Sequence, residues 1–243
     1  MIASHKVEID QVLVRFGGVV ALNAISAAFT APIGGIIGPN GAGKTTLMNV
    51  ISGFVTSKGG RVVVDGQDIL THPPHKRAHM GLRRSFQKEQ IADDLTVFEN
   101  VLVQLDHRLG SPAAKRAEAE RMLEVVGLSD RAHKPGALLS GFERRLTDVA
   151  RCMVGNPKLI MFDEPAGGLS IEETHALGDL ILGIHALTGA QTLVIDHDVE
   201  LISRVCTETL VLDFGRRIAF GPTAQVLADP KVKAAYLGTE DIA

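Results

Sequence analysis

The chain has 243 residues, enough for one large α/β domain or for a core with a small inserted lobe. Its 25 lysines and arginines stand against 28 aspartates and glutamates, and this net charge of −3 argues against a nucleic-acid-binding surface. No apolar run approaches the ~20 residues needed to span a bilayer, and the first ten residues hold no apolar signal core, so we expect any membrane role to come through partner subunits.

The N-terminal part of the chain predicts strands and one short helix. Residues 6–16 and 21–29 alternate between apolar and polar side chains, as the strands of an antiparallel sheet do. The run "GGIIG" at 34–38 predicts a short buried strand that leads into a glycine-rich loop. A helix is expected over 45–54, where apolar residues recur at helical spacing, and a strand over 61–69.

The middle of the chain has a different character. Helical patterns over 96–107 and 112–128 predict a helical lobe, between about residues 90 and 150, that is inserted into an α/β core. The two cysteines, Cys152 and Cys206, lie in apolar settings. They are expected to be reduced core residues of a cytosolic protein, with a disulfide as the weaker alternative.

The C-terminal part returns to alternating strands and helices. Buried strands are expected at 157–165 and 191–198, with a helix over 173–187 between them. This alternation favours a parallel sheet. The remaining tail predicts a hairpin followed by short helices.

Residues 38–46 read "GPNGAGKTT" and match the P-loop pattern, Gly38-x4-Gly43-Lys44-Thr45. Glycines let the backbone curl until several N–H groups point at phosphate oxygens, and the positive end of the following helix adds to the attraction. Lys44 is expected to reach the β- and γ-phosphates, and the Thr45 hydroxyl to bind Mg²⁺. The alternative is an ordinary glycine-rich turn, but the apolar strand before it and the helix after it favour nucleotide binding.

The strand "LIMFDEP" at 159–165 ends in two carboxylates, Asp163 and Glu164. In an open α/β sheet the carboxyl ends of strands line the ligand crevice, so these carboxylates should lie beside the P-loop. Asp163 would hold Mg²⁺, directly or through water, and Glu164 would polarise the attacking water. Read alone, the same residues could form a solvated acidic turn.

The order and spacing of the motifs resembles that of the ATP-binding-cassette (ABC) ATPases. The segments that carry the resemblance include "FGGVVAL", "GLRRSFQ", "LTVFENVL", "DEPAGGLS" and "ADPKVKAAYLG", which are similar to the cassettes of branched-chain amino acid uptake transporters. The resemblance covers nearly the whole chain and implies a single cassette over residues 1–243. It implies a RecA-like α/β core with an antiparallel β subdomain, at about 1–88 and 156–243, and an inserted α-helical subdomain, at about 89–155, that carries the signature turn.

The resemblance also implies a role for each matched residue. Phe16 would stack on adenine, Gln87 would contact Mg²⁺ and sense the membrane partner, and His197 would contact the γ-phosphate. Without the resemblance, Phe16 could be an ordinary core residue and His197 a capping or core residue. The expected ATP-binding residues are Phe16, Gly38, Pro39, Asn40, Gly41, Ala42, Gly43, Lys44, Thr45, Thr46 and Gln87. The expected catalytic residues are Glu164 and His197, and the expected Mg²⁺ ligands are Thr45, Gln87 and Asp163.

The signature turn departs from the family pattern. Ser140, Gly141, Phe142 and Glu143, which should meet the ATP of a partner cassette, follow Leu139 where Leu-Ser-Gly-Gly-Gln is usual. Ser140-x-x-Glu143 is also a capping box, and an apolar helix face follows it. A phenylalanine in place of glycine would obstruct the approach of backbone to phosphate, and a carboxylate would repel phosphate. One hypothesis is therefore a weakened signature that suits pairing with a non-identical cassette.

The family resemblance implies an ATPase that uses ATP and Mg²⁺ to energise a transporter, with import of branched-chain amino acids or a related small polar solute as the leading function. Alternatives are a lipopolysaccharide-export-type cassette and a degenerate cassette that binds ATP with little turnover and pairs with a paralogue. Expected partners are a second cassette, two transmembrane permease subunits and, indirectly, an extracytoplasmic solute-binding protein, with no nucleic acid. The expected location is cytoplasmic, peripheral on the inner face of the plasma membrane.

Overall fold

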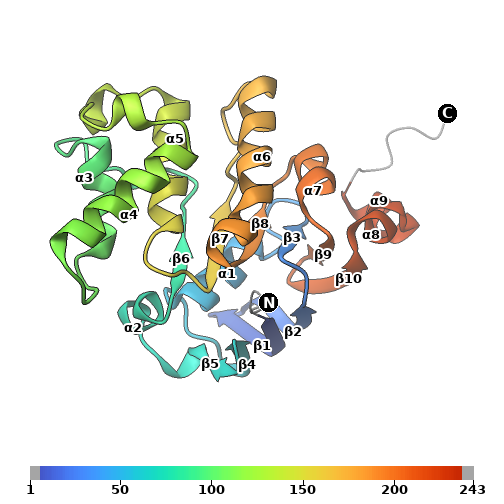
Figure 1. The fold of residues 1–243 in the computed structure, drawn as a ribbon. Coiled ribbons are helices and arrows are strands. Elements are labelled where there is room, and N and C mark those ends of the chain that lie inside the picture. The colour runs from blue at the N-terminus through green and yellow to red at the C-terminus, as the bar shows by residue number, and fades with distance from the viewer. Residues whose placement is uncertain (1–5, 237–243) are drawn as a thin grey trace.

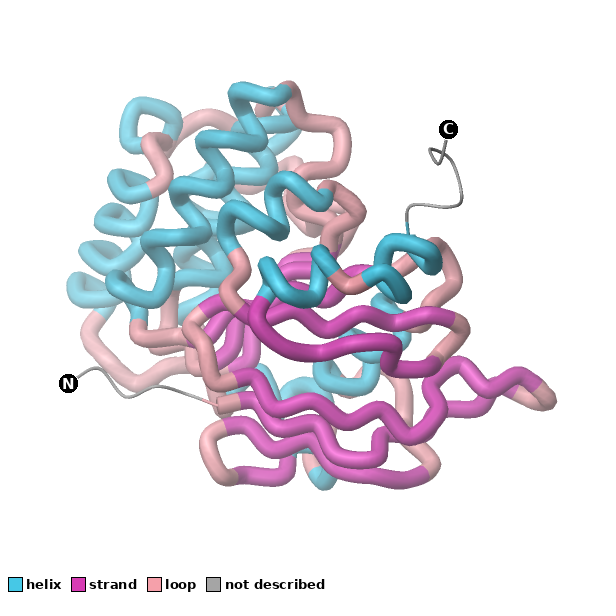
Figure 2. Tube along the Cα trace, turned by 90° about the vertical axis from the view of Figure 1, so that its right-hand side faces the viewer, coloured by secondary structure: helices cyan, strands magenta, loops and turns pink. Residues whose placement is uncertain are grey.

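The computed structural model describes residues 6–236 and folds them into two β-sheets and a set of helices. Figure 2 shows the strands stacked in the lower part of the molecule, with most of the helices gathered above them. The two chain ends of the described part both belong to the strand-rich half, where the first strand and the last two helices lie.

The antiparallel sheet has four strands in the order β2-β1-β4-β5. Their bounds are Val7–Phe16 for β1, Val19–Phe29 for β2, Gly59–Val64 for β4 and Gln67–Asp68 for β5. Alternating side chains of β1 are buried, but the alternation slips by one residue between Ile9 and Val12. Gln11 lies in this bulge with φ +50°, and the extra residue keeps the apolar side chains on the inner face after it.

The second sheet has six strands in the order β10-β9-β3-β8-β7-β6. Their bounds are Ile33–Ile37 for β3, Leu82–Arg84 for β6, Leu159–Asp163 for β7, Gln191–Ile195 for β8, Glu208–Asp213 for β9 and Arg216–Pro222 for β10. All neighbouring pairs are parallel except β9 with β10. Strands β3, β7 and β8 are buried along their whole length, which is why they read as continuous apolar runs.

Most of the helices lie above this parallel sheet in Figure 1, on the side away from the antiparallel sheet. Their bounds are Lys44–Ser52 for α1, Pro74–His79 for α2, Val97–Leu102 for α3, Pro112–Val125 for α4, Gly141–Met153 for α5, Ile171–Thr188 for α6, Val199–Val205 for α7, Thr223–Ala228 for α8 and Pro230–Tyr236 for α9. Short 3-10 turns span Ile69–Thr71, Val103–Leu105, Ser129–Arg131 and Gly136–Leu138.

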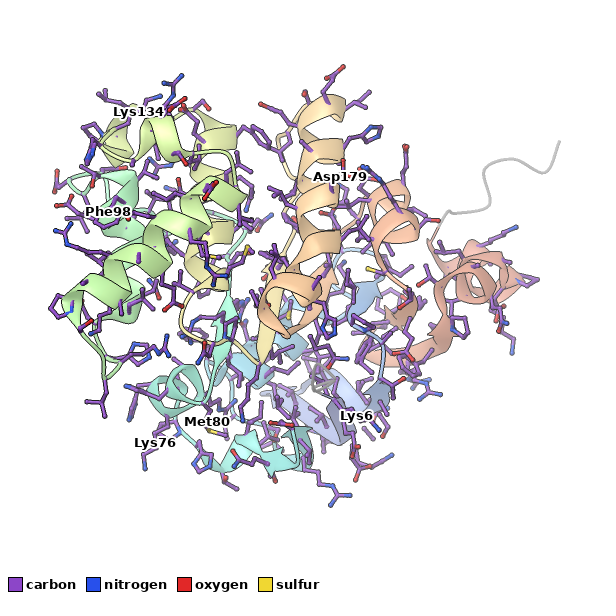
Figure 3. The ribbon with its side chains drawn as sticks, viewed as in Figure 1. Lys6, Lys76, Met80, Phe98, Lys134 and Asp179 are labelled. Carbon is purple, nitrogen blue, oxygen red and sulfur yellow. The ribbon has the colours of Figure 1, made fainter. Side chains whose placement is uncertain are left out.

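Two hydrophobic clusters hold these elements together. One joins both sheets to α1, whose Leu47, Met48 and Ile51 are fully buried. The other joins α3, α4, α5 and α6 to the opposite face of the parallel sheet. Phe98 of α3, labelled in Figure 3, is buried at the edge of this second cluster, with the Arg116 guanidinium 5.3 Å from its ring centre. Because α1 is packed between the two sheets, the glycine-rich loop before it is held at a fixed place.

Parallel strand order explains why distant motifs meet. The P-loop follows β3, His197 follows β8, Glu164 follows β7 and Gln87 follows β6. These four strands are neighbours in the order β3-β8-β7-β6, so the four segments all follow the carboxyl ends of parallel strands at one end of the sheet. Ligands of open α/β sheets bind at this end.

Most predicted elements are confirmed, with ends that differ by a few residues. Helix α5 begins at its predicted capping box, and the hairpin and short helices of the tail are present. Three of the α-helices and strands were not predicted: α2, β6 and α7. The single strand expected over 61–69 is instead two strands, β4 and β5, joined by a turn at 65–66. Strand β6 was not predicted because it has only three residues, Leu-Arg-Arg, and two arginines give no apolar strand pattern.

Cys152 and Cys206 are both free and buried, as predicted. Burial raises the pKa of the Cys206 thiol to about 12 and raises that of Cys152 further. Over residues 6–236, none of the helices combines the length and the apolar character that crossing a membrane requires.

Candidate nucleotide-binding site

The loop between β3 and α1 has a backbone shape that only glycine tolerates at two places. Gly38 has φ +150° and Gly43 has φ +104°. A Cβ atom at Gly38 would lie 2.1 Å from the carbonyl oxygen of Leu212, and one at Gly43 would lie 2.8 Å from that of Ala21. Any larger residue would push the loop away from the sheet, so these glycines set the curl that the P-loop pattern predicted.

Lys44 is folded back into this loop. Its Nζ donates hydrogen bonds to the carbonyl oxygens of Gly38, at 2.6 Å, and Pro39, at 3.0 Å. The residue is only 6% exposed. Burial lowers the pKa of Lys44, and nearby carboxylates act in the opposite direction. Those carboxylates belong to Glu164, Asp163 and Asp196.

An open depression of about 330 Å³ lies over the loop. It is lined by residues 40–46 of the loop, residues 19–21 of the β1–β2 hairpin, Glu164, and the turn formed by Phe214 and Gly215. The volume is at the lower end for a small-molecule site. The predicted residues Asn40, Gly41, Ala42, Gly43, Lys44, Thr45, Thr46 and Glu164 are thus brought together.

Phe16 lies at the rim rather than in the wall of this depression. It ends β1 opposite Val19, which does line the depression. Phe16 is 52% exposed, so it is not the ordinary core residue of the alternative interpretation. An exposed aromatic ring at this place is available for stacking.

The two carboxylates after β7 have different environments. Asp163 is buried, and its Oδ2 accepts a hydrogen bond from an Nη of Arg84 at 2.7 Å. Glu164 has φ +52°, a conformation that non-glycine residues rarely adopt and that is often found at functional sites. Its N–H donates to the Ile195 carbonyl oxygen at 2.7 Å, and its Oε2 accepts from Nε2 of Gln87 at 2.7 Å.

His197 lies in a second hollow, formed after β8. The histidine side chain is 66% exposed, with its Nδ1 3.6 Å from Oδ1 of Asp196. The hollow, about 320 Å³, is also lined by residues 166–169. Asp196 is fully buried and accepts hydrogen bonds from the N–H groups of Ala166 and Asp198. It therefore fixes the loop that presents His197, and the capping or core interpretation does not describe this exposed side chain.

The signature turn lies outside the depression, at the start of α5. The capping box is present: Ser140 Oγ accepts from the Glu143 N–H at 3.2 Å, and the Ser140 N–H donates to Oε2 of Glu143 at 2.8 Å. Lys134 Nζ donates to Glu143 at 2.6 Å, and Arg131 Nε at 3.3 Å. The hydrogen bond from Lys134, helped by that from the Ser140 backbone, lowers the pKa of Glu143. Lys134 is labelled near the upper end of the helical region in Figure 3.

These contacts correct two premises about the altered turn. The Phe142 side chain is partly buried against the helical hydrophobic cluster, so it does not stand free in front of the turn. The charge of Glu143 is balanced by two cations, so it is not an isolated anion. Gly141 is exposed, and a Cβ there would meet nothing within 4 Å. The turn therefore keeps an open face despite its unusual residues.

Sequence reasoning missed two residues at the site. Arg84 contacts Asp163, but its role depends on β6 lying beside β7, and that strand was not recognised. Phe214 lines the depression from a turn after β9. The only signals were an arginine pair before Phe86 and an aromatic residue in a hairpin turn, and neither points to a ligand without the fold.

A third hollow, of about 400 Å³, lies between α2 and the helical region. Its wall includes Phe54, Arg84 and Phe86 on the sheet side and Asp148 and Arg151 of α5 on the other. We call this hollow the interlobe groove. Arg84 of this groove also contacts Asp163 of the candidate nucleotide site.

Comparison with known proteins decides the family. The model of the family described as "ABC transporter" matches residues 28–167, and that described as "Branched-chain amino acid ATP-binding cassette transporter" matches residues 216–242. The chain is 34% identical to the high-affinity branched-chain amino acid transport ATP-binding protein BraF of Pseudomonas aeruginosa, over 95% of this chain and 97% of BraF. The chain belongs to the ABC transporter family. Within that family it is an ATP-binding subunit of the branched-chain amino acid transport group.

Two further comparisons concern the ABC fold and the alternative function. The crystal structure of the ADP conformation of MJ1267, an ATP-binding cassette of an ABC transporter, superposes with a TM-score of 0.86 at 30% identity, covering 97% of this chain and all of that one. The predicted fold class, an α/β ABC cassette, is therefore confirmed. The lipopolysaccharide export system ATP-binding protein LptB of Haemophilus influenzae is 36% identical, over 85% of this chain and 86% of LptB.

Proposed function

We propose that this ABC ATPase binds ATP on its P-loop and hydrolyses it to ADP and phosphate, and that the energy drives import of branched-chain amino acids or a related small polar solute. The observation that carries the proposal is the depression itself, where Lys44, Thr45 and Glu164 face one space and Gln87 is bonded to Glu164. The cargo is inferred from the match to the branched-chain group over residues 216–242.

In this proposal the P-loop residues bind the phosphates. The N–H groups of the glycine-rich loop and of the first turn of α1 would donate to phosphate oxygens, and Lys44 would leave the carbonyl oxygens of Gly38 and Pro39 to reach the β- and γ-phosphates. Phe16 at the rim would stack on adenine. Glu164 would accept a proton from, and orient, the attacking water, while His197 would contact the γ-phosphate after a movement of its loop.

The residues present fit Mg²⁺. Their donor set is all oxygen: the Thr45 hydroxyl, the Asp163 carboxylate and the amide oxygen of Gln87. Within residues 6–236 no group of three or more His, Cys, Asp or Glu side chains is arranged to hold a metal by itself. Mg²⁺ is typically bound through one or two carboxylates, here that of Asp163, and keeps several waters beside the substrate phosphates. When bound, it would neutralise charge on the β- and γ-phosphates.

A second cassette, identical or paralogous, would complete the site. Ser140 and Gly141, with Phe142 and Glu143 behind them, would meet the ATP bound to that partner. The packing of Phe142 and the neutralised charge of Glu143 support a competent signature turn over a weakened one. We therefore favour a motor with two working sites, and the degenerate cassette becomes the outcome to test against.

Two permease subunits would carry this cassette on the cytoplasmic, inner face of the plasma membrane, and a solute-binding protein would deliver the cargo from outside. The interlobe groove is the proposed seat of a permease helix, because it lies between the α/β core (about 1–88 and 156–243, including the β subdomain) and the helical subdomain (about 89–155). This division into subdomains is itself part of the proposal.

The test uses Glu164→Gln and wild-type protein. Wild-type protein should hydrolyse ATP, Glu164→Gln should bind ATP with turnover reduced at least about a hundredfold, and light scattering should show an ATP-dependent dimer of the variant. A variant that binds ATP but stays monomeric would indicate a weak signature and a required paralogue. Wild-type protein that binds no ATP would overturn the proposal.

The cargo is tested by reconstitution. The cassette with its cognate permeases in proteoliposomes should take up radiolabelled leucine or a related solute only when ATP and the solute-binding protein are present. Stimulation of ATP hydrolysis by lipopolysaccharide, with no solute uptake, would favour the export alternative instead.

A further inference from the structure

Arg84 contacts four side chains beside the proposed metal site. One Nη donates to Oδ2 of Asp163 at 2.7 Å. The other Nη donates to Oδ1 of Asn49 and to Oγ of Ser52, both at 2.7 Å, and both of these residues belong to α1. The guanidinium carbon lies 4.8 Å from the ring centre of Phe86. The side chain thus links β6, β7 and α1, on the P-loop side of the sheet.

The ion pair between Arg84 and Asp163 is buried, with side-chain exposures of 6% and 5%. A buried carboxylate needs a cation or several hydrogen-bond donors, because desolvation of an unpaired charge is costly. The Asp163 N–H donates to Ser85 Oγ at 3.4 Å, and Lys44 is a second cation near enough to interact with the Asp163 carboxylate. Among the described residues, Arg84 is the cation that forms an ion pair with this carboxylate.

The same guanidinium forms part of the wall of the interlobe groove. Arg84 and Phe86 line the groove together with Phe54, whose ring centre lies 5.8 Å from that of Phe86. The buried Nε of Arg84 makes no hydrogen bond to any residue that the structure describes. A group that enters the groove next to Phe86 can thus displace or fix the guanidinium without touching the nucleotide.

We propose that Arg84 is a positioning residue that stands in for the metal cation on Asp163, and that it connects the interlobe groove to that carboxylate. This inference rests on the proposed function, because Asp163 is a metal ligand only there. Arg84 is bonded to Oδ2 of Asp163, so a divalent cation has to compete with the guanidinium for that oxygen, and release of Oδ2 by Arg84 is a condition for full metal binding. Contacts in the groove then act on the site through Phe86 and the guanidinium.

The test is thermal unfolding without nucleotide, in 10 mM MgCl₂ and in EDTA. Wild-type protein should change its Tm by no more than about 1 °C between the two conditions, because Arg84 already pairs with Asp163. Arg84→Met should unfold roughly 6 °C or more lower in EDTA, since it leaves a buried carboxylate unpaired. Mg²⁺ should restore about 4 °C of this loss, as expected for an affinity near 1 mM.

Arg77→Met is the matched control. Arg77 is also buried, but its guanidinium donates only to carbonyl oxygens, of His72, Val50, Ile51 and Leu70. This variant should lose Tm without any response to Mg²⁺. Arg84→Lys should restore both the stability and the insensitivity to Mg²⁺. If Arg84→Met is too unstable to study, the double variant with Asp163→Asn removes both charges and should recover stability with no response to Mg²⁺.

The variant Phe86→Ala tests the link to the groove. It removes the ring beside the guanidinium but leaves the ion pair, so Mg²⁺ should raise its Tm by roughly 1–2 °C, less than in Arg84→Met. Equal Mg²⁺ responses in Arg84→Met and Arg77→Met would overturn the proposal, and no response in Phe86→Ala would remove the groove from it. ATP binding by wild-type protein is measured alongside, and its absence would count against the proposed function and not against Arg84 alone.

Discussion

Gln87 and Glu164 are 77 residues apart in the chain, yet Nε2 of Gln87 donates to Oε2 of Glu164 at 2.7 Å. The bond joins the segment after β6 to the segment after β7. It holds the carboxylate in one orientation while the backbone of Glu164 is held in a left-handed conformation, at φ +52°, by its bond to Ile195. Removal of the amide would free the carboxylate but leave the P-loop untouched.

Gln87→Ala should therefore separate turnover from ATP binding. We expect kcat to fall about tenfold, or ~1.4 kcal/mol of barrier, while the Kd for ATP changes less than about threefold. Steady-state ATPase assays and calorimetric titration measure the two quantities. Gln67→Ala, on the exposed β4–β5 hairpin, is the control and should change neither. An unchanged kcat in Gln87→Ala would mean that the bond does not orient Glu164 for turnover.

Asp148 should make the folded protein less stable as the pH rises. Burial raises its pKa to about 6, against a smaller opposite effect of Arg151 and Arg145. A folded-state pKa above the unfolded value means that the folded state binds the proton more tightly, so stability is highest below the unfolded pKa and falls as the pH rises through about 6. Between pH 5 and 7.5 this group should remove on the order of 1 kcal/mol of the free energy of unfolding.

Urea unfolding at the two pH values measures this effect. Asp148→Asn should lose most of the difference, while Asp94→Asn, at an exposed aspartate, should keep it. An identical pH dependence in wild-type protein and Asp148→Asn would show that the carboxylate stays ionised through its pairing with Arg151, which lies 3.3 Å away.

The sequence predicts the fold and the phosphate side of the site because each depends on local patterns. The P-loop needs Gly38 and Gly43 at set places, and the buried strand before Asp163 reads as one apolar run. The remaining contacts depend on which strands are neighbours. Arg84 can be assigned to Asp163 only when β6 is placed beside β7, and three residues of Leu-Arg-Arg carry no strand signal. The effect of the altered signature residues could not be predicted either. The cluster against which Phe142 packs and the two cations that pair with Glu143 are known only from the fold.

Glu143 should stabilise α5 more than an ordinary capping residue does. It completes a capping box and also pairs with Lys134 and Arg131, whereas Glu173, which completes the matching box of α6, forms no ion pair among the described residues. Glu143→Ala should lower the free energy of unfolding by about 1–2 kcal/mol, and Glu173→Ala by about 1 kcal/mol or less. Urea unfolding measures both.

The pH dependence of this contribution follows from the lowered pKa of Glu143. A folded-state pKa below the unfolded value gives stability that is present above the unfolded pKa, about 4.3, and is lost as the pH falls through the folded value. The difference between wild-type protein and Glu143→Ala should therefore shrink in acid. Equal effects of Glu143→Ala and Glu173→Ala at pH 7 would show that the two ion pairs add nothing to the cap.

Phe214 should contribute to nucleotide affinity through the base or ribose. Its side chain is 83% exposed, and its backbone has φ +41°, which is strained for an aromatic residue. The turn is held there because the Gly215 N–H donates to the Ala42 carbonyl oxygen of the P-loop at 3.0 Å, and the Gly215 carbonyl oxygen accepts from Asn23 at 2.7 Å. A large apolar side chain kept exposed at the wall of the depression is a candidate ligand contact.

Phe214→Ala should weaken ATP binding about fivefold to tenfold, as the loss of a ring contact with a base does, and should leave tripolyphosphate binding unchanged. Calorimetric titration of both ligands separates the base from the phosphates. Leu109→Ala, at a fully exposed loop residue away from the depression, is the control and should bind both ligands like wild-type protein. A parallel loss for ATP and tripolyphosphate would mean that Phe214 shapes the P-loop through Gly215 instead of contacting the nucleotide.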